Sequence, residues 1–181
     1  MSVKSSIQSR YPSQDVVDKY ISDVLDGVIP TCKYTQLAVQ RHLNDLETAA
    51  GRGLYFDPAA AQRAIDFSQL LKHSKGEWAG QNLRLEPWQQ FFVWVLFGWK
   101  KSDGKRRYRT AYNEVARKNG KTTFMAALAL YGMGFDDESG AEIYSVATKE
   151  AQAMLSFEEG QRMVQKSGYL GGMAKVHKKA I

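Results

Sequence analysis

The sequence has very few of the residues that build disulfide frameworks and metal sites. It contains one cysteine, Cys32, and three scattered histidines, His42, His73 and His177. A single cysteine excludes an internal disulfide framework and any zinc site made of several cysteines. The histidines have no partners at the spacing of metal ligands, so we expect no metal site built on them.

Long apolar segments are also lacking. The longest apolar run, Phe91–Trp99, contains Gly98 and is far shorter than the roughly 20 residues that span a bilayer. Polar residues interrupt every apolar stretch in the first thirty residues, so no signal-peptide pattern is present. These absences predict a soluble, cytoplasmic protein that does not associate with a membrane.

What the sequence does contain is enough apolar material for a buried core. The chain has 181 residues, of which 44% are hydrophobic and 12% aromatic. Apolar residues at helical spacing predict helices over 15–26 and about 33–50. A third helix is expected to begin at Asp57-Pro58, with the aspartate as N-cap and the proline at the first helical position. Residues 1–75 are therefore expected to form a small helical N-terminal region.

The pattern changes over residues 76–181. Helices are expected from Glu86 to about 97, from Lys121 to about 133, and from a Thr148 cap to about 165. Strands are expected over 107–114 and 141–147, with a third beginning at 174–181. Strands that alternate with helices are typical of an α/β fold with a parallel sheet. We therefore predict an incomplete parallel-sheet core of the P-loop NTPase type.

The positive charge is concentrated in one stretch. Nine basic residues lie between Lys100 and Lys121, opposed only by Asp103 and Glu114, in a chain whose net charge is +6. Such a local field attracts phosphate, whether it belongs to a nucleotide or to nucleic acid. Two simpler interpretations stay open: a solvated basic loop, or a nucleic-acid-binding module that uses Lys100–Arg109.

The end of this stretch has the pattern of a phosphate-binding loop, Val115-Ala116-Arg117-Lys118-Asn119-Gly120-Lys121-Thr122. It follows an expected strand and opens an expected helix, as the P-loop motif requires. Unpaired N–H groups and the helix dipole favour an anion there, and Gly120 lets the backbone approach a phosphate closely. Lys121 would reach the β- and γ-phosphates, and the Thr122 hydroxyl would ligate Mg²⁺. The usual motif has glycine where this chain has Val115.

That departure points to a family. The run Ala116–Thr123 resembles the variant P-loop of phage terminase large subunits, in which arginine or lysine replaces the glycine-rich start. Other segments also resemble that family: Gly76-Glu77-Trp78-Ala79-Gly80, Leu85-Glu86-Pro87-Trp88-Gln89, Leu96-Phe97-Gly98-Trp99, Arg107-Tyr108-Arg109, and Ala141–Thr148 followed by Gln152-Ala153. The resemblance covers about residues 76–165, the N-terminal part of such a subunit.

The resemblance implies an ATP-driven motor that packages double-stranded viral DNA into proheads. It implies ATP and Mg²⁺ as cofactors, and as partners the small terminase subunit, the portal protein and further copies in a ring. It gives Lys121 and Arg117 catalytic roles, with Arg117 acting on the γ-phosphate, and it makes Gln89 the reader of the adenine edge. The cofactor-binding residues that it implies are Gln89, Arg117, Lys118, Asn119, Gly120, Lys121, Thr122 and Thr123, with Thr122 as the metal ligand. Gln89 as a helix-surface residue and Arg117 as a solvent-facing or phosphate-positioning residue stay open as alternatives.

Two expected parts of such an enzyme are not recognisable in the sequence. No apolar strand ends in an Asp-Glu pair that would hold Mg²⁺ and activate water, and no nuclease segment with clustered carboxylates is found. We therefore expect a truncated product, a prophage remnant or one half of a split protein, with slow or no ATP hydrolysis. A helicase or kinase fragment and an inactive remnant are further alternatives. The four tryptophans have apolar neighbours, so core packing is expected for them rather than base stacking.

Overall fold

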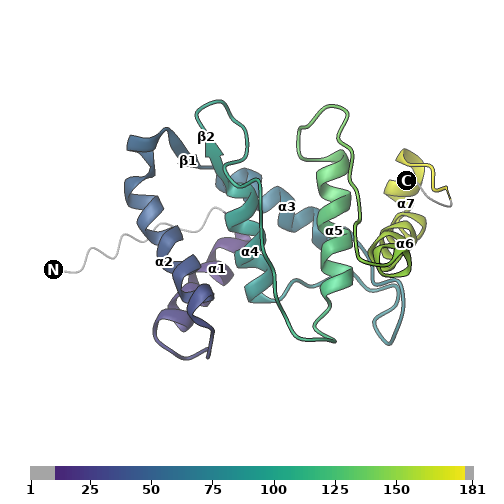
Figure 1. Ribbon diagram of the computed structural model, residues 1–181, viewed down its shortest axis with the longest axis horizontal. Coiled ribbons are helices and arrows are strands. Elements are labelled where there is room, and N and C mark those ends of the chain that lie inside the picture. The colour runs from purple at the N-terminus through teal and green to yellow at the C-terminus, as the bar shows by residue number, and fades with distance from the viewer. Residues whose placement is uncertain (1–10, 178–181) are drawn as a thin grey trace. The chain divides into compact units, whose positions relative to one another are not determined.

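The computed structural model describes residues 11–177 and is mainly helical (Figure 1). The chain folds into two compact units. The first contains residues up to 65 together with 85–111, and the second contains 66–84 and 112 onward. The units interleave along the chain, whereas the division expected from the sequence cuts it once, at residue 75. That division stays a prediction about domains.

The first unit is built around helix α4 (Pro87–Gly98). Helices α1 (Pro12–Leu25), α2 (Lys33–Thr48) and the beginning of α3 (Pro58–Leu70) belong to it, with a short 3₁₀ turn, η1 (Ala49–Arg52). Strands β1 (Leu54–Phe56) and β2 (Trp99–Lys101) pair antiparallel, with Phe56 opposite Trp99. Aromatic side chains form much of its core. For example, α1 and α4 pack together through Tyr20 and Phe91, whose ring centroids lie 5.5 Å apart.

A close approach explains the glycine at the end of α4. A Cβ on Gly98 would lie 2.5 Å from two ring carbons of Phe56 and 3.2 Å from the Cβ of Ala61. Real Cβ atoms are not found at 2.5 Å from other heavy atoms, so only glycine lets β1 and α3 pack against this helix end.

The second unit has helices α5 (Lys121–Gly134), α6 (Glu150–Lys166) and α7 (Gly168–Met173). Its core is formed by Ala126, Ala127 and Leu130 of α5, Met163 and Val164 of α6, Leu170 of α7, and Leu71 and Leu83 from the segment after α3. The apolar residues of α5 suggest a helix that is buried on all sides. It buries one face in this core, while Met125, Ala129 and Met133 line an open groove.

The six expected helices are confirmed, because their signals are local. The Asp57 carboxylate accepts the Ala60 N–H at 3.0 Å, as an N-cap should. The expected cap of α6 is wrong by one residue: Lys149 is the N-cap, and the Thr148 hydroxyl bonds to Gln152 Oε1 at 3.1 Å. No helix in the described part of the chain has the length and apolar character needed to cross a membrane.

The expected parallel sheet is not formed among the described residues. Residues 107–114 and 141–147 run without helical structure, but neither segment pairs with a strand, and β1–β2 is the sheet that the described chain contains. Residues 174–176 form no strand, and 178–181 lie outside the described residues. A strand-like sequence pattern indicates an extended backbone, but a β-strand also needs a neighbouring strand that pairs with its N–H and C=O groups. That second condition is not met here.

Candidate functional site

The loop at residues 115–122 lies directly before α5, at the end of the extended segment. Gly120 is the N-cap of α5 and has φ of 67°, and Lys118 has φ of 69°. Two left-handed residues on either side of Asn119 turn the chain sharply into the helix, and the Gly120 carbonyl accepts the first helical bond, from Phe124 N–H at 2.9 Å. The amide groups at the start of α5 have no partners within the helix, so they form a site that suits an anion.

Lys121 lies across this loop. Its Nζ donates a hydrogen bond to the carbonyl oxygen of Val115 at 3.1 Å, and Asn119 Nδ2 donates to the Ala116 carbonyl at 3.3 Å. These bonds join the end of the loop to its beginning and hold the ammonium group at the helix N-terminus. An ammonium has three protons, so one bond to a carbonyl leaves two for phosphate oxygens.

The loop carries a concentrated positive charge that is open to solvent. Arg117, Lys118 and Lys121 are all exposed, and within residues 11–177 none of the three joins an ion pair. Thr122 is exposed and Thr123 half-buried in the first turn of α5. This arrangement of exposed donors suits a polyanion, and the Thr122 side chain provides an exposed hydroxyl beside it. Among the described residues there is no cluster of three acidic, histidine or cysteine side chains that could hold a metal ion.

Gln89 is placed differently from the other predicted residues. It lies on α4 in the first unit, whereas the loop belongs to the second. Its side chain is 7% exposed, and its Oε1 accepts the Glu86 N–H at 2.9 Å, as the third residue of a capping box does. Reading adenine with donor and acceptor together would require this bond to open. The adenine-reading role of Gln89 stays a prediction.

Part of the basic stretch is used inside the first unit. Arg107 pairs with Asp45, which is buried and also pairs with Arg52, and the Arg107 guanidinium lies 5.4 Å from the ring centre of Trp99. Burial alone would raise the pKa of the Asp45 carboxyl, but hydrogen bonds from both arginines hold that pKa below its usual value. Arg106 lies over the ring of Phe97 at 5.6 Å. These two arginines are therefore occupied by packing and ion pairing.

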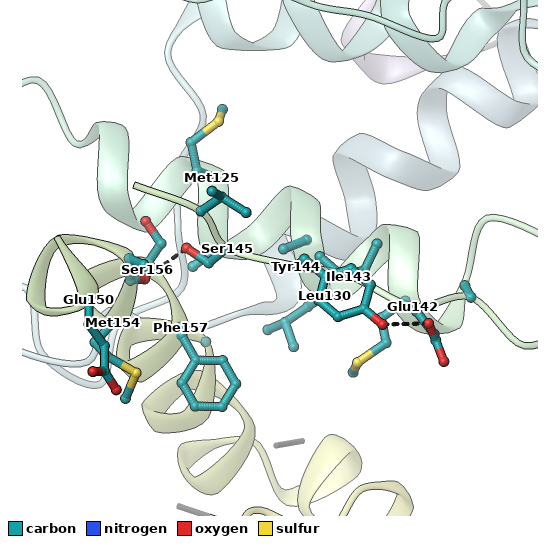
Figure 2. A pocket seen from close by; sticks show the side chains of 17 residues that line it. Met125, Leu130, Glu142, Ile143, Tyr144, Ser145, Glu150, Met154, Ser156 and Phe157 are labelled. Carbon is teal, nitrogen blue, oxygen red and sulfur yellow. Dashed lines mark hydrogen bonds between the residues drawn. The ribbon is translucent and has the colours of Figure 1, made fainter. Parts of the chain in front are cut away.

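An apolar groove of about 880 Å³ lies elsewhere in the second unit, between α5, the extended segment 141–147 and α6 (Figure 2). Its polar groups are mostly paired: Tyr144 OH donates to Glu142 at 2.6 Å, and Ser145 Oγ donates to the Ala153 carbonyl at 2.7 Å. Ile143 forms part of its wall.

Two features of the second unit were missed by reasoning from the sequence. Trp78 is 56% exposed, contrary to the expected core packing, and Glu159 is buried against Ser74 at 2.8 Å. The glycines on either side of Trp78, Gly76 and Gly80, were the available signal for an exposed turn. No sequence signal pairs residues 74 and 159, because they come together only in the folded chain.

Comparison with known proteins gives one match. The model of the family described as terminase large subunit, ATPase domain, matches residues 87–179, which is just over half of the chain. The matched stretch includes α4, the loop at 115–122 and helices α5 to α7. No curated protein and no solved structure matches the chain.

Proposed function

Because this chain belongs to the terminase large-subunit family, we propose that its loop at residues 115–122 binds the triphosphate of ATP together with Mg²⁺. The observation that carries the proposal is the position of the Lys121 ammonium, which is held against the Val115 carbonyl at the N-terminus of α5. There it would contact the β- and γ-phosphates, while the first amides of α5 bind the same oxygens.

The other loop residues have defined roles in this proposal. The Thr122 hydroxyl would ligate Mg²⁺, and the ion would neutralise negative charge on the phosphates. Arg117, exposed and free of ion pairs among the described residues, would place its guanidinium on the γ-phosphate and stabilise the charge that develops there during transfer. Lys118, Asn119, Gly120 and Thr123 would shape the loop and supply amides.

At the level of the whole protein, the proposal is the ATP-dependent packaging of double-stranded DNA into viral proheads. The family suggests a small terminase subunit, a portal protein and further copies of the large subunit as partners. In that setting the loop supplies the nucleotide-binding step of the motor.

The test is the affinity of the chain for ATP-Mg, measured by titration calorimetry with Lys121→Ala. Hydrogen bonds to charged groups contribute about 1.5–3 kcal/mol, so the affinity should fall by roughly ten- to a hundred-fold. Lys149→Ala is the matched control, because it removes the same charge at the N-cap of a different helix. Equal affinities of the Lys121 variant and the unchanged protein would refute the proposal.

A nucleic-acid-binding role for Lys100–Arg109 is the second candidate. Lys105 and Arg109 are exposed there, although Arg106 and Arg107 are occupied in the first unit. This role predicts DNA binding that weakens steeply with salt and is indifferent to Lys121→Ala. A filter-binding titration at two salt concentrations separates it from the leading proposal.

A further inference from the structure

Residues 72–82 form a hairpin-like projection in the second unit, here called the tryptophan hairpin. Its two arms are joined by hydrogen bonds from His73 N–H to Gln81 O and from Gly80 N–H to His73 O, both at 2.9 Å. Gly76 and Gly80 have φ of 80° and 85°, and nothing lies within 4 Å of the Cβ that either would carry. The glycines are therefore required by the backbone turn and not by crowding.

The hairpin presents one large aromatic side chain to solvent. Trp78 is 56% exposed, whereas Trp94 and Trp99 are 3% and 1% exposed. A single exposed aromatic residue is common on protein surfaces and carries no argument by itself. What distinguishes Trp78 is the structure that holds its hairpin.

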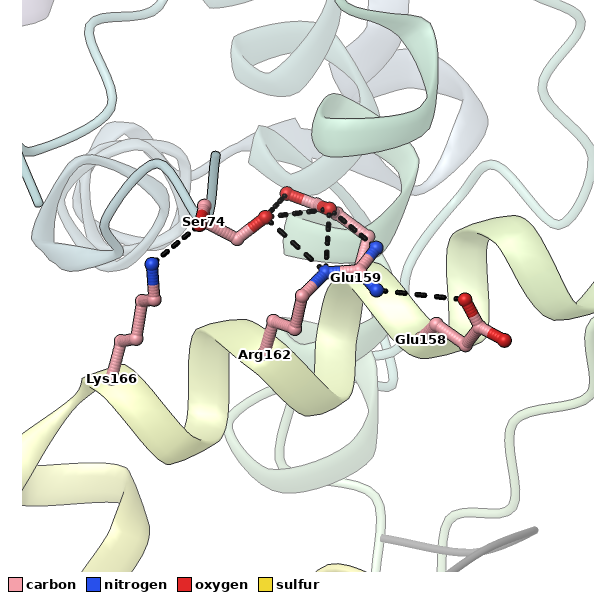
Figure 3. Close-up of polar contacts among 5 residues, drawn as sticks. All are labelled: Ser74, Glu158, Glu159, Arg162 and Lys166. Carbon is pink, nitrogen blue, oxygen red and sulfur yellow. Dashed lines mark hydrogen bonds and ion pairs between the residues drawn. The ribbon is translucent and has the colours of Figure 1, made fainter. Parts of the chain in front are cut away.

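A polar cluster around the buried Glu159 carboxylate fixes the hairpin to α6 (Figure 3). Ser74 Oγ lies 2.8 Å from both carboxylate oxygens of Glu159, which is 2% exposed, and Arg162 pairs with the same carboxylate at 2.9 Å. Lys166 donates a hydrogen bond to the Ser74 carbonyl. Opening these contacts would leave the buried Glu159 carboxylate without partners, which is costly, so they hold the hairpin to α6. The tip that carries Trp78 is thus held in place by four residues that are not at the tip.

The base of the hairpin lies close to the beginning of α5. Leu71 and Leu83, which flank the hairpin, pack in one core cluster with Ala126 and Ala127. Ala126 is five residues after Lys121, which is about 7.5 Å along a helix axis. Figure 1 shows the hairpin extending toward the end of α5 at which the chain enters from the loop at 115–122. The hairpin therefore extends toward the same end of α5 as the phosphate-binding loop.

We propose that Trp78 stacks on the base of the nucleotide whose phosphates this loop binds, and that Ser74 and Glu159 are positioning residues for it. The inference rests on the proposed function of the loop. An indole suits the role because every nucleobase has a π-face, and a side chain that is already fixed loses little freedom on binding.

The charges around the hairpin favour a nucleotide over a strand of nucleic acid. A single strand is usually bound along a groove of free cations. Here the exposed Lys75 is offset by the exposed Glu77 next to Trp78, and Arg162 and Lys166 are both used in contacts with Glu159 and Ser74. The hairpin would supply the base contact, and the loop would supply the contacts for phosphate.

The experiment compares ligands with and without a base. ATP and inorganic tripolyphosphate, each with Mg²⁺, are titrated calorimetrically into the full chain and into Trp78→Ala, and tryptophan emission is recorded in parallel. Trp78→Ala should weaken ATP binding roughly five- to a hundred-fold and leave tripolyphosphate binding unchanged. ATP should quench an emission component that Trp78→Ala lacks, and Trp78→Phe should retain most of the affinity.

Each outcome is decisive. An equal loss for both ligands, or no loss for ATP, overturns the stacking role. Quenching by a single-stranded oligonucleotide without quenching by ATP overturns it in favour of nucleic acid. If neither ligand binds the unchanged protein and Lys121→Ala changes nothing, the proposed function of the loop fails instead.

The positioning role has its own variant pair. Ser74→Ala should weaken the binding of ATP but not that of tripolyphosphate. Ser145→Ala removes another hydroxyl hydrogen bond of the same unit and should change neither affinity. Circular dichroism confirms that the variants are folded. Unchanged ATP affinity in folded Ser74→Ala would overturn the positioning role and leave the stacking test intact.

Discussion

Acidification is expected to protonate His42, which the first unit holds in its neutral form. The side chain is 3% exposed, and its Nδ1 accepts a hydrogen bond from Trp99 Nε1 at 3.0 Å. The rings of Phe56 and Phe91 lie edge-on to it, with centroids at 5.3 and 6.1 Å. Burial lowers the pKa of His42 from 6.5 to about 4, although the nearby Asp45 carboxylate acts in the opposite direction.

The sign of the effect follows from this depressed pKa. In the unfolded chain the imidazole takes up a proton as the pH falls through 6.5, but in the folded chain it does so only near 4. The stabilisation is therefore complete above the unfolded pKa and is lost as the pH falls toward the folded pKa. Linkage gives a loss of about 2 kcal/mol near pH 5 and about 3 kcal/mol below both pKa values. Protonation would also remove the acceptor that Trp99 uses.

Urea unfolding of the chain and of His42→Gln measures this loss, with the emission of the buried Trp94 and Trp99 as the probe. Glutamine can still accept a hydrogen bond but does not titrate, so its difference from the unchanged protein isolates the histidine. The pKa of Asp45 lies below its usual value and therefore outside this pH range. The unfolding free energy of the unchanged protein minus that of His42→Gln should fall by about 2 kcal/mol between about pH 7.5 and about pH 5. A difference that stays constant across this range would refute the reasoning.

Two further substitutions test the packing of each unit. Gly98→Ala should destabilise the first unit by about 1–3 kcal/mol, because its Cβ would meet the ring of Phe56 at 2.5 Å. Gly134→Ala, which has nothing within 4 Å of its Cβ, is the control. Equal melting temperatures of the two variants would contradict the prediction. Glu159→Gln should cost about 1–3 kcal/mol in urea unfolding, because it leaves the partly exposed Arg162 without its buried partner. Unchanged stability of the second unit would show that this ion pair contributes nothing.

Those features of the fold that depend on neighbouring residues could be predicted from the sequence. Asp57-Pro58 predicts where α3 begins, and the Ala60 N–H is indeed bound to the Asp57 carboxylate. The loop before α5 was likewise found from Gly120 and Lys121, because a helix N-terminus is built from consecutive residues. The hydrogen bond from Lys121 to the Val115 carbonyl could not be predicted, because every residue has a backbone oxygen and the sequence does not show which one is used.

The predictions that were wrong concern features that depend on residues far apart in the chain. Residues 141–147 were interpreted as a strand of a parallel sheet, but Tyr144 and Val146 are 76% and 87% exposed, and within residues 11–177 the segment has no strand partner. Trp78 was assigned to the core because of its apolar neighbours in the sequence, whereas the turn between Gly76 and Gly80 places it in solvent. Neither outcome is visible in a window of neighbouring residues.

The basic stretch also shows that a sequence does not reveal which charged side chains are paired in the folded chain. The sequence shows one basic stretch from Lys100 to Lys121, and counting alone cannot divide it. The structure divides it: Arg107 is used on buried Asp45 in the first unit, whereas Arg117 and Lys121 remain exposed in the second. A cation already paired with a buried carboxylate contributes little to binding a phosphate from solution. The exposed positive field therefore extends to the start of α5, where helix amides already favour an anion, and this coincidence supports a nucleotide rather than a diffuse polyanion as the ligand of the loop.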